Sequence, residues 1–130
     1  MKKHTLISII CPVYNEQESI PVFYSRVQTV LAPLRKHHRF ELIFINDSST
    51  DNTLNVIQGL RDKDSSIQVL TLSRNFGYQA SVLAGMKHAH GKGIITIDVD
   101  CEDPPELIPQ FISRWKEGYD VVYGLREGRP

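Results

Sequence analysis

The chain has 130 residues, and 15 Lys and Arg balance 15 Asp and Glu, so its formal net charge is zero. Hydrophobic residues make up 41% and charged residues 23%, which is typical of a single globular domain. The zero net charge gives no support for attraction to nucleic acid, and we expect no such partner. The longest apolar run, Leu6 to Val13, is too short to span a bilayer, and no signal peptide is visible. Two cysteines, Cys11 and Cys101, make no disulfide framework, which favours a reduced, cytoplasmic setting.

Strand-like and helix-like segments alternate along the chain. Apolar runs predict five strands, at Thr5–Val13, Phe40–Ile45, Ile67–Leu72, Gly93–Ile97 and Asp120–Tyr123. Apolar residues at helical spacing predict a helix after each of the first four strands, starting near Ser19, Asp51, Ala80 and Pro104. This alternation predicts an α/β fold: a mostly parallel sheet with helices on both faces and right-handed crossovers.

Polar clusters follow the predicted strands. They are Tyr14 to Glu16, Asn46 to Ser49, Arg74 to Gly77, Asp98 to Asp103, and Arg126. In a wound parallel sheet the carboxyl ends of the strands share one edge, and ligands bind there where the winding reverses. We therefore expect one ligand site on this edge.

The acidic stretch from Asp98 to Asp103 indicates the chemistry of that site. Side chains alternate along a strand, so Asp98 and Asp100 are expected to project to one side. Two neighbouring carboxylates repel each other unless a cation lies between them, and a hard divalent ion, Mg²⁺ or Mn²⁺, is the simplest candidate. The alternative is a solvated acidic turn that starts the next helix. The gathering of polar loops on one edge favours the metal site.

Other phosphate-binding patterns are absent from the sequence. No Gly-x-Gly-x-x-Gly motif and no Walker loop follows the first strand, and the residues after the third strand do not suit a response-regulator receiver domain. What remains is an acceptor-rich loop at Asp47, Ser48 and Ser49, suited to ribose hydroxyls or a base edge, and an acidic metal loop. This pairing suits a nucleoside diphosphate bridged by a cation, which makes the diphosphate a leaving group.

Four motifs resemble those of family 2 glycosyltransferases. They are Pro12 to Glu16, Asn46 to Asp51, Arg74 to Gly77, and Asp98 to Glu106. The chain is most similar to the polyprenyl-phosphate sugar transferases, namely dolichyl-phosphate mannose synthases and, more so, bacterial bactoprenol (undecaprenyl-phosphate) glucosyltransferases. The resemblance implies the Rossmann-like GT-A nucleotide-sugar-binding fold.

The resemblance also implies roles for particular residues. Those that bind the nucleotide are Pro12, Tyr14 and Glu16 at the base, Asp47 at base or ribose, and Asp98 at ribose or metal. Those that hold the metal are Asp98, Asp100 and Glu102. Asp100 and Arg126 are the implied catalytic residues, because one holds the metal and the other contacts phosphate.

The implied activity is a metal-dependent, inverting transfer of a hexose from a UDP-sugar, most simply UDP-glucose, to a polyprenyl phosphate at the cytoplasmic face of the membrane. Three positions depart from the family pattern: Ser48 stands where Gly is usual, Tyr78 where Lys is frequent, and Glu102 where Gln is usual. The family's acceptor region and transmembrane helices lie beyond Pro130. We therefore expect residues 1–130 to be a single nucleotide-binding domain, truncated at its C-terminal end. Self-association is left open.

Each assignment has an alternative. The rival function is a non-catalytic nucleotide-sugar-binding fragment or remnant. Structural roles are open for several residues: Asp51 and Asp103 as helix caps, Glu16 as a first-turn acid, Tyr14 as a packing residue, and Arg74 and Arg126 as surface cations.

Overall fold

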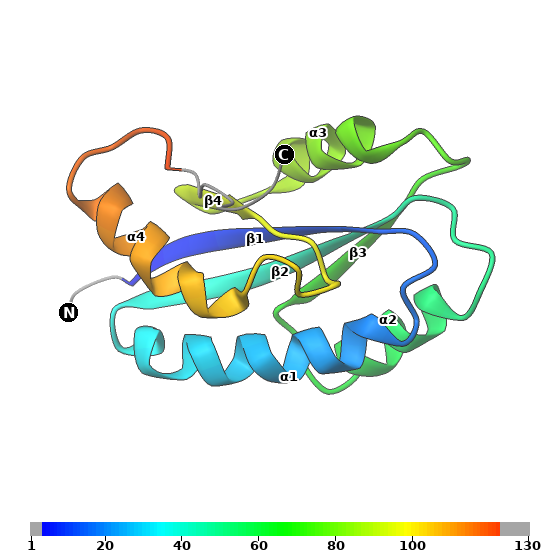
Figure 1. Cartoon of the computed structure of the whole chain (residues 1–130), viewed down its shortest axis with the longest axis horizontal. Coiled ribbons are helices and arrows are strands. Elements are labelled where there is room, and N and C mark those ends of the chain that lie inside the picture. The colour runs from blue at the N-terminus through cyan, green and yellow to red at the C-terminus, as the bar shows by residue number, and fades with distance from the viewer. Residues whose placement is uncertain (1–3, 123–130) are drawn as a thin grey trace.

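The computed structural model describes residues 4–122. Within these residues, four strands alternate with helices in chain order (Figure 1). The elements are β1 (Thr5–Val13), α1 (Ser19–Leu31), η1 (Ala32–Lys36), β2 (His38–Asn46), α2 (Thr53–Arg61), β3 (Ile67–Thr71), α3 (Tyr78–His88), β4 (Gly93–Thr96), η2 (Pro105–Leu107) and α4 (Ile108–Lys116). The predicted strand–helix alternation and α/β class are confirmed.

The sheet is parallel throughout its described strands and has the order β3-β2-β1-β4. The chain moves outward from β1 to β2 and β3, and then returns to the other side of β1 to form β4. The winding therefore reverses between β1 and β4, where Ile7 pairs with Gly93 and Ile10 with Thr96. The carboxyl ends of these two strands are the position at which such sheets bind ligands.

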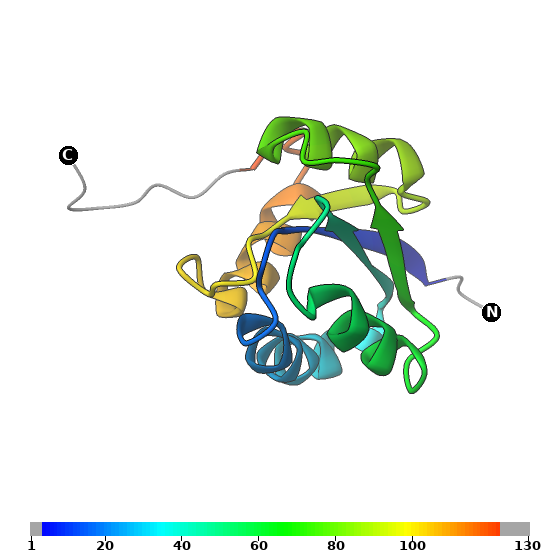
Figure 2. The same ribbon diagram turned by 90° about the vertical axis from the view of Figure 1, so that its right-hand side faces the viewer.

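Helices cover both faces of the sheet, with α3 on one side and α1 and α2 on the other (Figures 1 and 2). The larger core contains alternate residues of β1, because successive strand residues point to opposite faces, together with the buried apolar residues of α1, α2 and α4. On the α3 face, Ile10 and Ile45 are completely buried. A Cβ on Gly85 would lie 2.5 Å from Ile10 Cγ2 and 2.8 Å from Ile45 Cδ1. The glycine therefore lets α3 lie close against the sheet.

A buried polar network fixes the chain just before β4. Glu41 is only 6% exposed, and it accepts hydrogen bonds from Ser8 Oγ (2.5 Å), Gln68 Nε2 (3.1 Å) and the backbone N–H of His90 (2.7 Å). The His90 ring nitrogen Nδ1 lies 3.2 Å from the same carboxylate, and Gly91 N–H donates to Ser8 Oγ. These contacts anchor the α3–β4 connection to β1 and β2, which sets where β4 enters the sheet.

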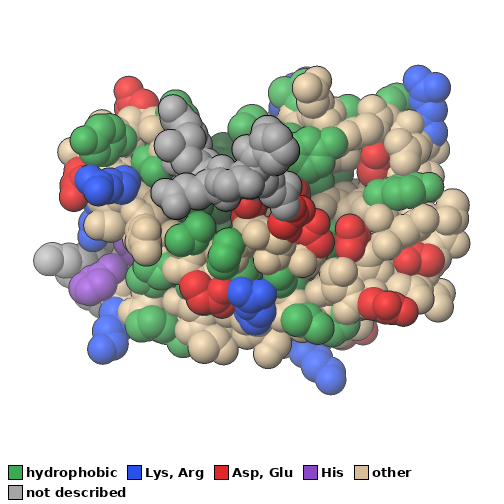
Figure 3. Space-filling model, viewed as in Figure 1, with side chains coloured by type: hydrophobic (Ala, Val, Ile, Leu, Met, Phe, Trp, Pro, Cys, Tyr) green, Lys and Arg blue, Asp and Glu red, His purple; other side chains and the backbone are tan. Residues whose placement is uncertain are grey.

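Two predicted elements differ in the structure. Residues 120–122 are not in a strand, and Tyr123 lies outside the described residues. The helix expected to begin at Asp103 and Pro104 begins later, because the 3₁₀ turn η2 comes before α4 and has Pro104 as its N-cap. No helix in the described part of the chain is long and apolar enough to cross a membrane. On the face shown in Figure 3, Lys and Arg side chains are spread out rather than gathered in one patch.

Candidate functional site

A pocket of about 230 Å³ lies at the carboxyl ends of the strands, where the winding reverses. Its walls come from the ends of β1 and β2, the start of α3 and the segment after β4. The lining residues are Pro12, Val13, Tyr14, Glu16, Asp47, Tyr78, Ser81, Asp98, Val99 and Asp100.

This pocket brings together most of the site residues predicted from the sequence. Those that line it are Pro12, Tyr14, Glu16, Asp47, Asp98 and Asp100. Glu102 does not line it, and Arg126 lies outside the described residues. Tyr14 is 44% exposed, which does not fit a core-packing role. Glu16 precedes the first turn of α1, so it is not the first-turn helix acid of the alternative.

Asn15 holds the loop after β1 against the loop after β2. It has a φ of 51°, in the left-handed region. Its Oδ1 accepts hydrogen bonds from the N–H groups of Thr50 (2.8 Å) and Asp51 (3.3 Å). The next residue, Glu16, also contacts this region, because its N–H donates to Thr53 Oγ1 at 2.9 Å. Asn15 thus places its neighbours Tyr14 and Glu16 at the pocket, a role that sequence reasoning missed.

Asp47 is 5% exposed and lies directly after β2. Its Oδ1 accepts a hydrogen bond from Phe76 N–H at 2.8 Å, and its Oδ2 accepts one from Gly77 N–H at 2.9 Å. Both carboxylate oxygens therefore contact the loop between β3 and α3. Each oxygen has two lone pairs, so a further donor from a ligand can still bind.

The acidic segment after β4 supplies two carboxylates to the pocket. Asp98 Oδ1 is buried and has no hydrogen-bond partner among the residues that the structure describes. Asp100 is exposed, and its Oδ1 accepts the N–H of Glu102 at 3.0 Å. Cys101, between Asp100 and Glu102, has a φ of 62° and so turns the chain sharply. A buried carboxylate oxygen without a partner is costly unless a ligand satisfies it.

Within residues 4–122, no group of three or more His, Cys, Asp or Glu side chains is placed to hold a metal ion. The predicted set of Asp98, Asp100 and Glu102 is therefore not gathered into a closed cage. An ion such as Mg²⁺ is usually held by one or two carboxylates, with substrate phosphates completing its shell. Asp98 and Asp100 fit that open kind of site.

Cys11 lies in β1 and is fully buried. Burial, together with the nearby Asp98 carboxylate, raises the pKa of the Cys11 thiol far above its ordinary value. The thiol is therefore neutral, and it belongs to the core rather than to the chemistry of the pocket.

An ion pair holds the far end of the acidic segment. Arg26 of α1 contacts Glu106 of η2 with both Nε and Nη2, and the Nε to Oε2 distance is 3.2 Å. The segment from Asp98 to Glu106 is thus fixed by β4 at one end and by α1 at the other.

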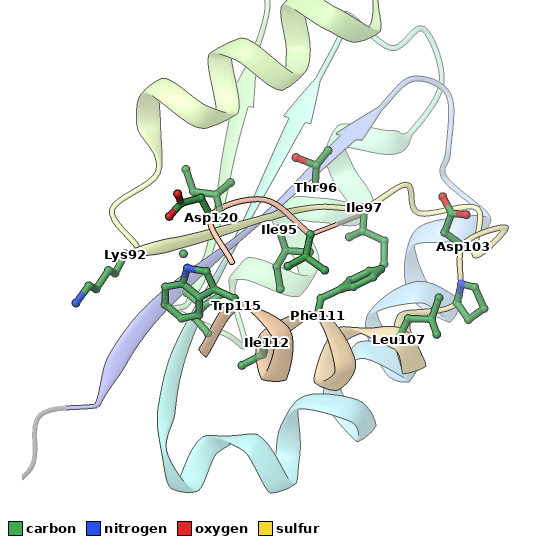
Figure 4. A pocket seen from close by; sticks show the side chains of 15 residues that line it. Lys92, Ile95, Thr96, Ile97, Asp103, Leu107, Phe111, Ile112, Trp115 and Asp120 are labelled. Atoms are coloured by element: carbon green, nitrogen blue, oxygen red, sulfur yellow. The ribbon is translucent and has the colours of Figure 1, made fainter. Parts of the chain in front are cut away.

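A larger cavity of about 660 Å³ lies between β4 and α4. Figure 4 shows Ile95, Phe111 and Trp115 around it, from both elements. None of the site residues predicted from the sequence lines it. The smaller pocket is the candidate site because the convergent carboxylates lie there.

The family and the relatives that this chain matches are all described as glycosyltransferases. The sequence model of one protein family, described as glycosyl transferase family 2, matches residues 8–130 of this chain. An uncharacterized glycosyltransferase, YkcC of Bacillus subtilis, is 41% identical over 99% of this chain, and the bactoprenol glucosyl transferase of Shigella phage SfV is 42% identical over 95%. The chain spans 39% of the length of each of these relatives.

The fold has a close counterpart among solved structures. The mannosyltransferase PcManGT of Pyrobaculum calidifontis, solved with GDP-Man and Mn²⁺, superimposes with a TM-score of 0.71. The match covers 87% of this chain and 32% of that one, at 18% sequence identity. The nucleotide-sugar-transferase fold predicted from the sequence is confirmed.

Proposed function

Since the chain belongs to glycosyl transferase family 2, we propose that its pocket binds the nucleotide part of a UDP-sugar, most simply UDP-glucose, together with Mg²⁺ or Mn²⁺. The observation that carries the proposal is the pair Asp98 and Asp100 on one wall of the pocket, with a buried oxygen of Asp98 left unpartnered. A cation held there would neutralise the diphosphate and make it a better leaving group.

We assign nucleoside recognition mainly to the other residues that line the pocket. Pro12, Tyr14 and Glu16 would contact the base, with the exposed Tyr14 ring able to stack on it. Asp47 would bind base or ribose, and Asp98 would bind ribose or the ion. Glu102 would lie beside the ion, and Arg126 would contact a phosphate.

We further propose that the whole protein transfers the hexose, with inversion, to a polyprenyl phosphate at the cytoplasmic face of the membrane. The support is the 42% identity to a bactoprenol glucosyl transferase. A phosphate monoester has a second pKa of about 6, so it is largely dianionic at neutral pH and needs little help from a general base. Asp100 and Arg126 would act on the departing diphosphate.

The second candidate is a domain that binds the nucleotide-sugar without transferring the sugar. The coverage of the relatives, 39% of their length, favours this for the isolated chain. Transfer also requires the acceptor phosphate to be held in line with the sugar, and such placement can contribute about 7–11 kcal/mol. An assay with radiolabelled UDP-glucose and bactoprenyl phosphate separates the two. Metal-dependent product that Asp100→Ala abolishes would show that these residues suffice for catalysis.

The donor proposal is tested by calorimetry with UDP. We expect binding in Mn²⁺ or Mg²⁺, and much weaker binding with EDTA or after Asp100→Ala. Asp62→Asn is the matched control, because Asp62 is an exposed acid after α2 that does not line the pocket. Equal affinity with and without EDTA would overturn the metal-bridged donor site.

A further inference from the structure

Asp47 has an unusual environment for a ligand-binding acid. It is 5% exposed, and each of its carboxylate oxygens accepts a backbone N–H from the β3–α3 loop. We propose that Asp47 is a positioning residue of the donor site: it holds this loop and thereby places Tyr78 and Ser81 in the pocket. The inference rests on the proposed function, and it gives Asp47 a role that does not depend on direct contact with the nucleoside.

The loop needs an anchor because of its conformation. Gly77 has φ 96° and ψ 169°, a region essentially restricted to glycine. The neighbouring side chains give little buried contact: Phe76 is 47% exposed, and the Arg74 guanidinium lies 4.6 Å from the centre of its ring. The two hydrogen bonds that Asp47 accepts tie this loop to the end of β2.

The same bonds set the start of α3. Gly77 is the N-cap of that helix, and Ser81, in its first turn and 1% exposed, contacts Gly77 O at 3.2 Å. Tyr78 and Ser81 both line the pocket. A shift of Gly77 would therefore move two pocket residues together.

Charge supports this arrangement. The amino end of a helix favours a negative group, and the Asp47 carboxylate occupies that position on α3. The diphosphate would lie near Asp98 and Asp100 instead.

A double-mutant cycle separates positioning from direct contact. A Cβ at Gly77 would meet no atom within 4 Å, so Gly77→Ala acts only through the backbone. If Asp47 works through the loop, Asp47→Ala and Gly77→Ala each weaken UDP binding by about tenfold, and the double variant is no weaker than either. Two independent effects would instead multiply to about a hundredfold, which would overturn the proposal.

Amide hydrogen exchange without nucleotide provides the second readout. We expect Asp47→Ala to speed exchange at Phe76 and Gly77, while Asp62→Asn leaves both amides unchanged. If Asp47→Ala does not fold, Asp47→Asn replaces it in every arm, because it keeps the side-chain size but can accept at only one atom. Unchanged exchange at both amides would overturn the proposal. Absence of UDP binding to the unaltered protein would refute the proposed function instead, and exchange would then decide the role of Asp47.

Discussion

Two acidic side chains, one near the start of β4 and one beyond its end, show how differently this fold treats a carboxylate. Glu41, on the side from which β4 starts, has contacts from Ser8, Gln68 and His90 at both of its oxygens. Asp98, beyond the other end of β4, has a buried oxygen with no partner in the described part of the chain. A carboxylate satisfied by the protein stabilises the fold, whereas one left unsatisfied is available to a ligand.

Positive backbone φ angles in non-glycine residues also occur on the side of the sheet that carries the pocket. The non-glycine residues with positive φ in the range 4–122 are Asn15, Ser48 and Cys101. All three lie in loops that follow strands, on the edge that carries the pocket. The site end therefore holds strained backbone as well as an unpartnered acid, as is common where a fold is shaped for binding.

The largest effect on stability is expected from Glu41→Ala. The change removes the acceptor for the buried Ser8 hydroxyl, the half-buried Gln68 amide and the N–H of the exposed His90, so the free energy of unfolding should fall by about 3 kcal/mol. Urea denaturation followed by circular dichroism measures it. A loss below about 1 kcal/mol would mean that the Glu41 network contributes little to the fold.

The corresponding substitution on the pocket side of the sheet is Asp98→Ala. We expect UDP binding in Mn²⁺ to weaken by about 2 kcal/mol, roughly thirtyfold, while the free energy of unfolding changes by less than about 1 kcal/mol. Calorimetry and urea denaturation on the same preparation provide both values. A large loss of stability with unchanged UDP affinity would make Asp98 a structural acid like Glu41, and the comparison would fail.

Lowering the pH should reduce the stability of the protein through the Glu41 carboxylate. Burial by itself would raise the pKa of Glu41, but hydrogen bonds from Ser8 and from the backbone and ring of His90 outweigh it and hold the pKa below the ordinary 4.5. Stability from this group is therefore complete above about pH 4.5 and is lost as pH falls through the lowered value. Urea midpoints measured from pH 6 to pH 3 should fall less steeply in Glu41→Gln. Equal slopes in the two proteins would contradict this linkage.

The smallest effect is expected from Ser48→Gly. Ser48 has a φ of 59°, which glycine adopts without strain, so the substitution should stabilise the fold by about 1 kcal/mol. Asn15→Gly is the matched control: it relieves a φ of 51° but removes the bonds to Thr50 and Asp51, and we expect no net gain. A thermal melt compares the two. Equal stabilisation by both variants would show that the Asn15 bonds contribute nothing.

The sequence predicted well where local pattern decides structure. The bounds of β1 were predicted in full, because a run of Leu and Ile ends at Val13 and Tyr14 starts a polar loop. The pocket was predicted because strand-end loops share one edge in a wound sheet. Six of the predicted residues accordingly line one cavity, although their roles stay predictions.

Long-range partners could not be predicted in the same way. Glu41 lies within an apolar run, and only the pairing of β1 with β2 places it beside Ser8. The hydrogen bonds that Asp47 accepts from the N–H groups of Phe76 and Gly77 depend on where α3 begins, which no local pattern specifies. In the sequence, the signal that could have indicated the Glu41 network was Glu41 itself, a single acidic residue inside an apolar strand.

The position of β4 in the sheet has a consequence for folding order. β1 is joined to β2 by the crossover that contains α1, whereas its other neighbour, β4, comes from residues much further along the chain. Longer loops cost more entropy to close, so we expect β1, β2 and β3 to assemble before β4 joins them. Asp98 and Asp100 would then reach the pocket only in the last step, and a chain emerging from the ribosome would acquire its acidic wall after the rest of the core has formed.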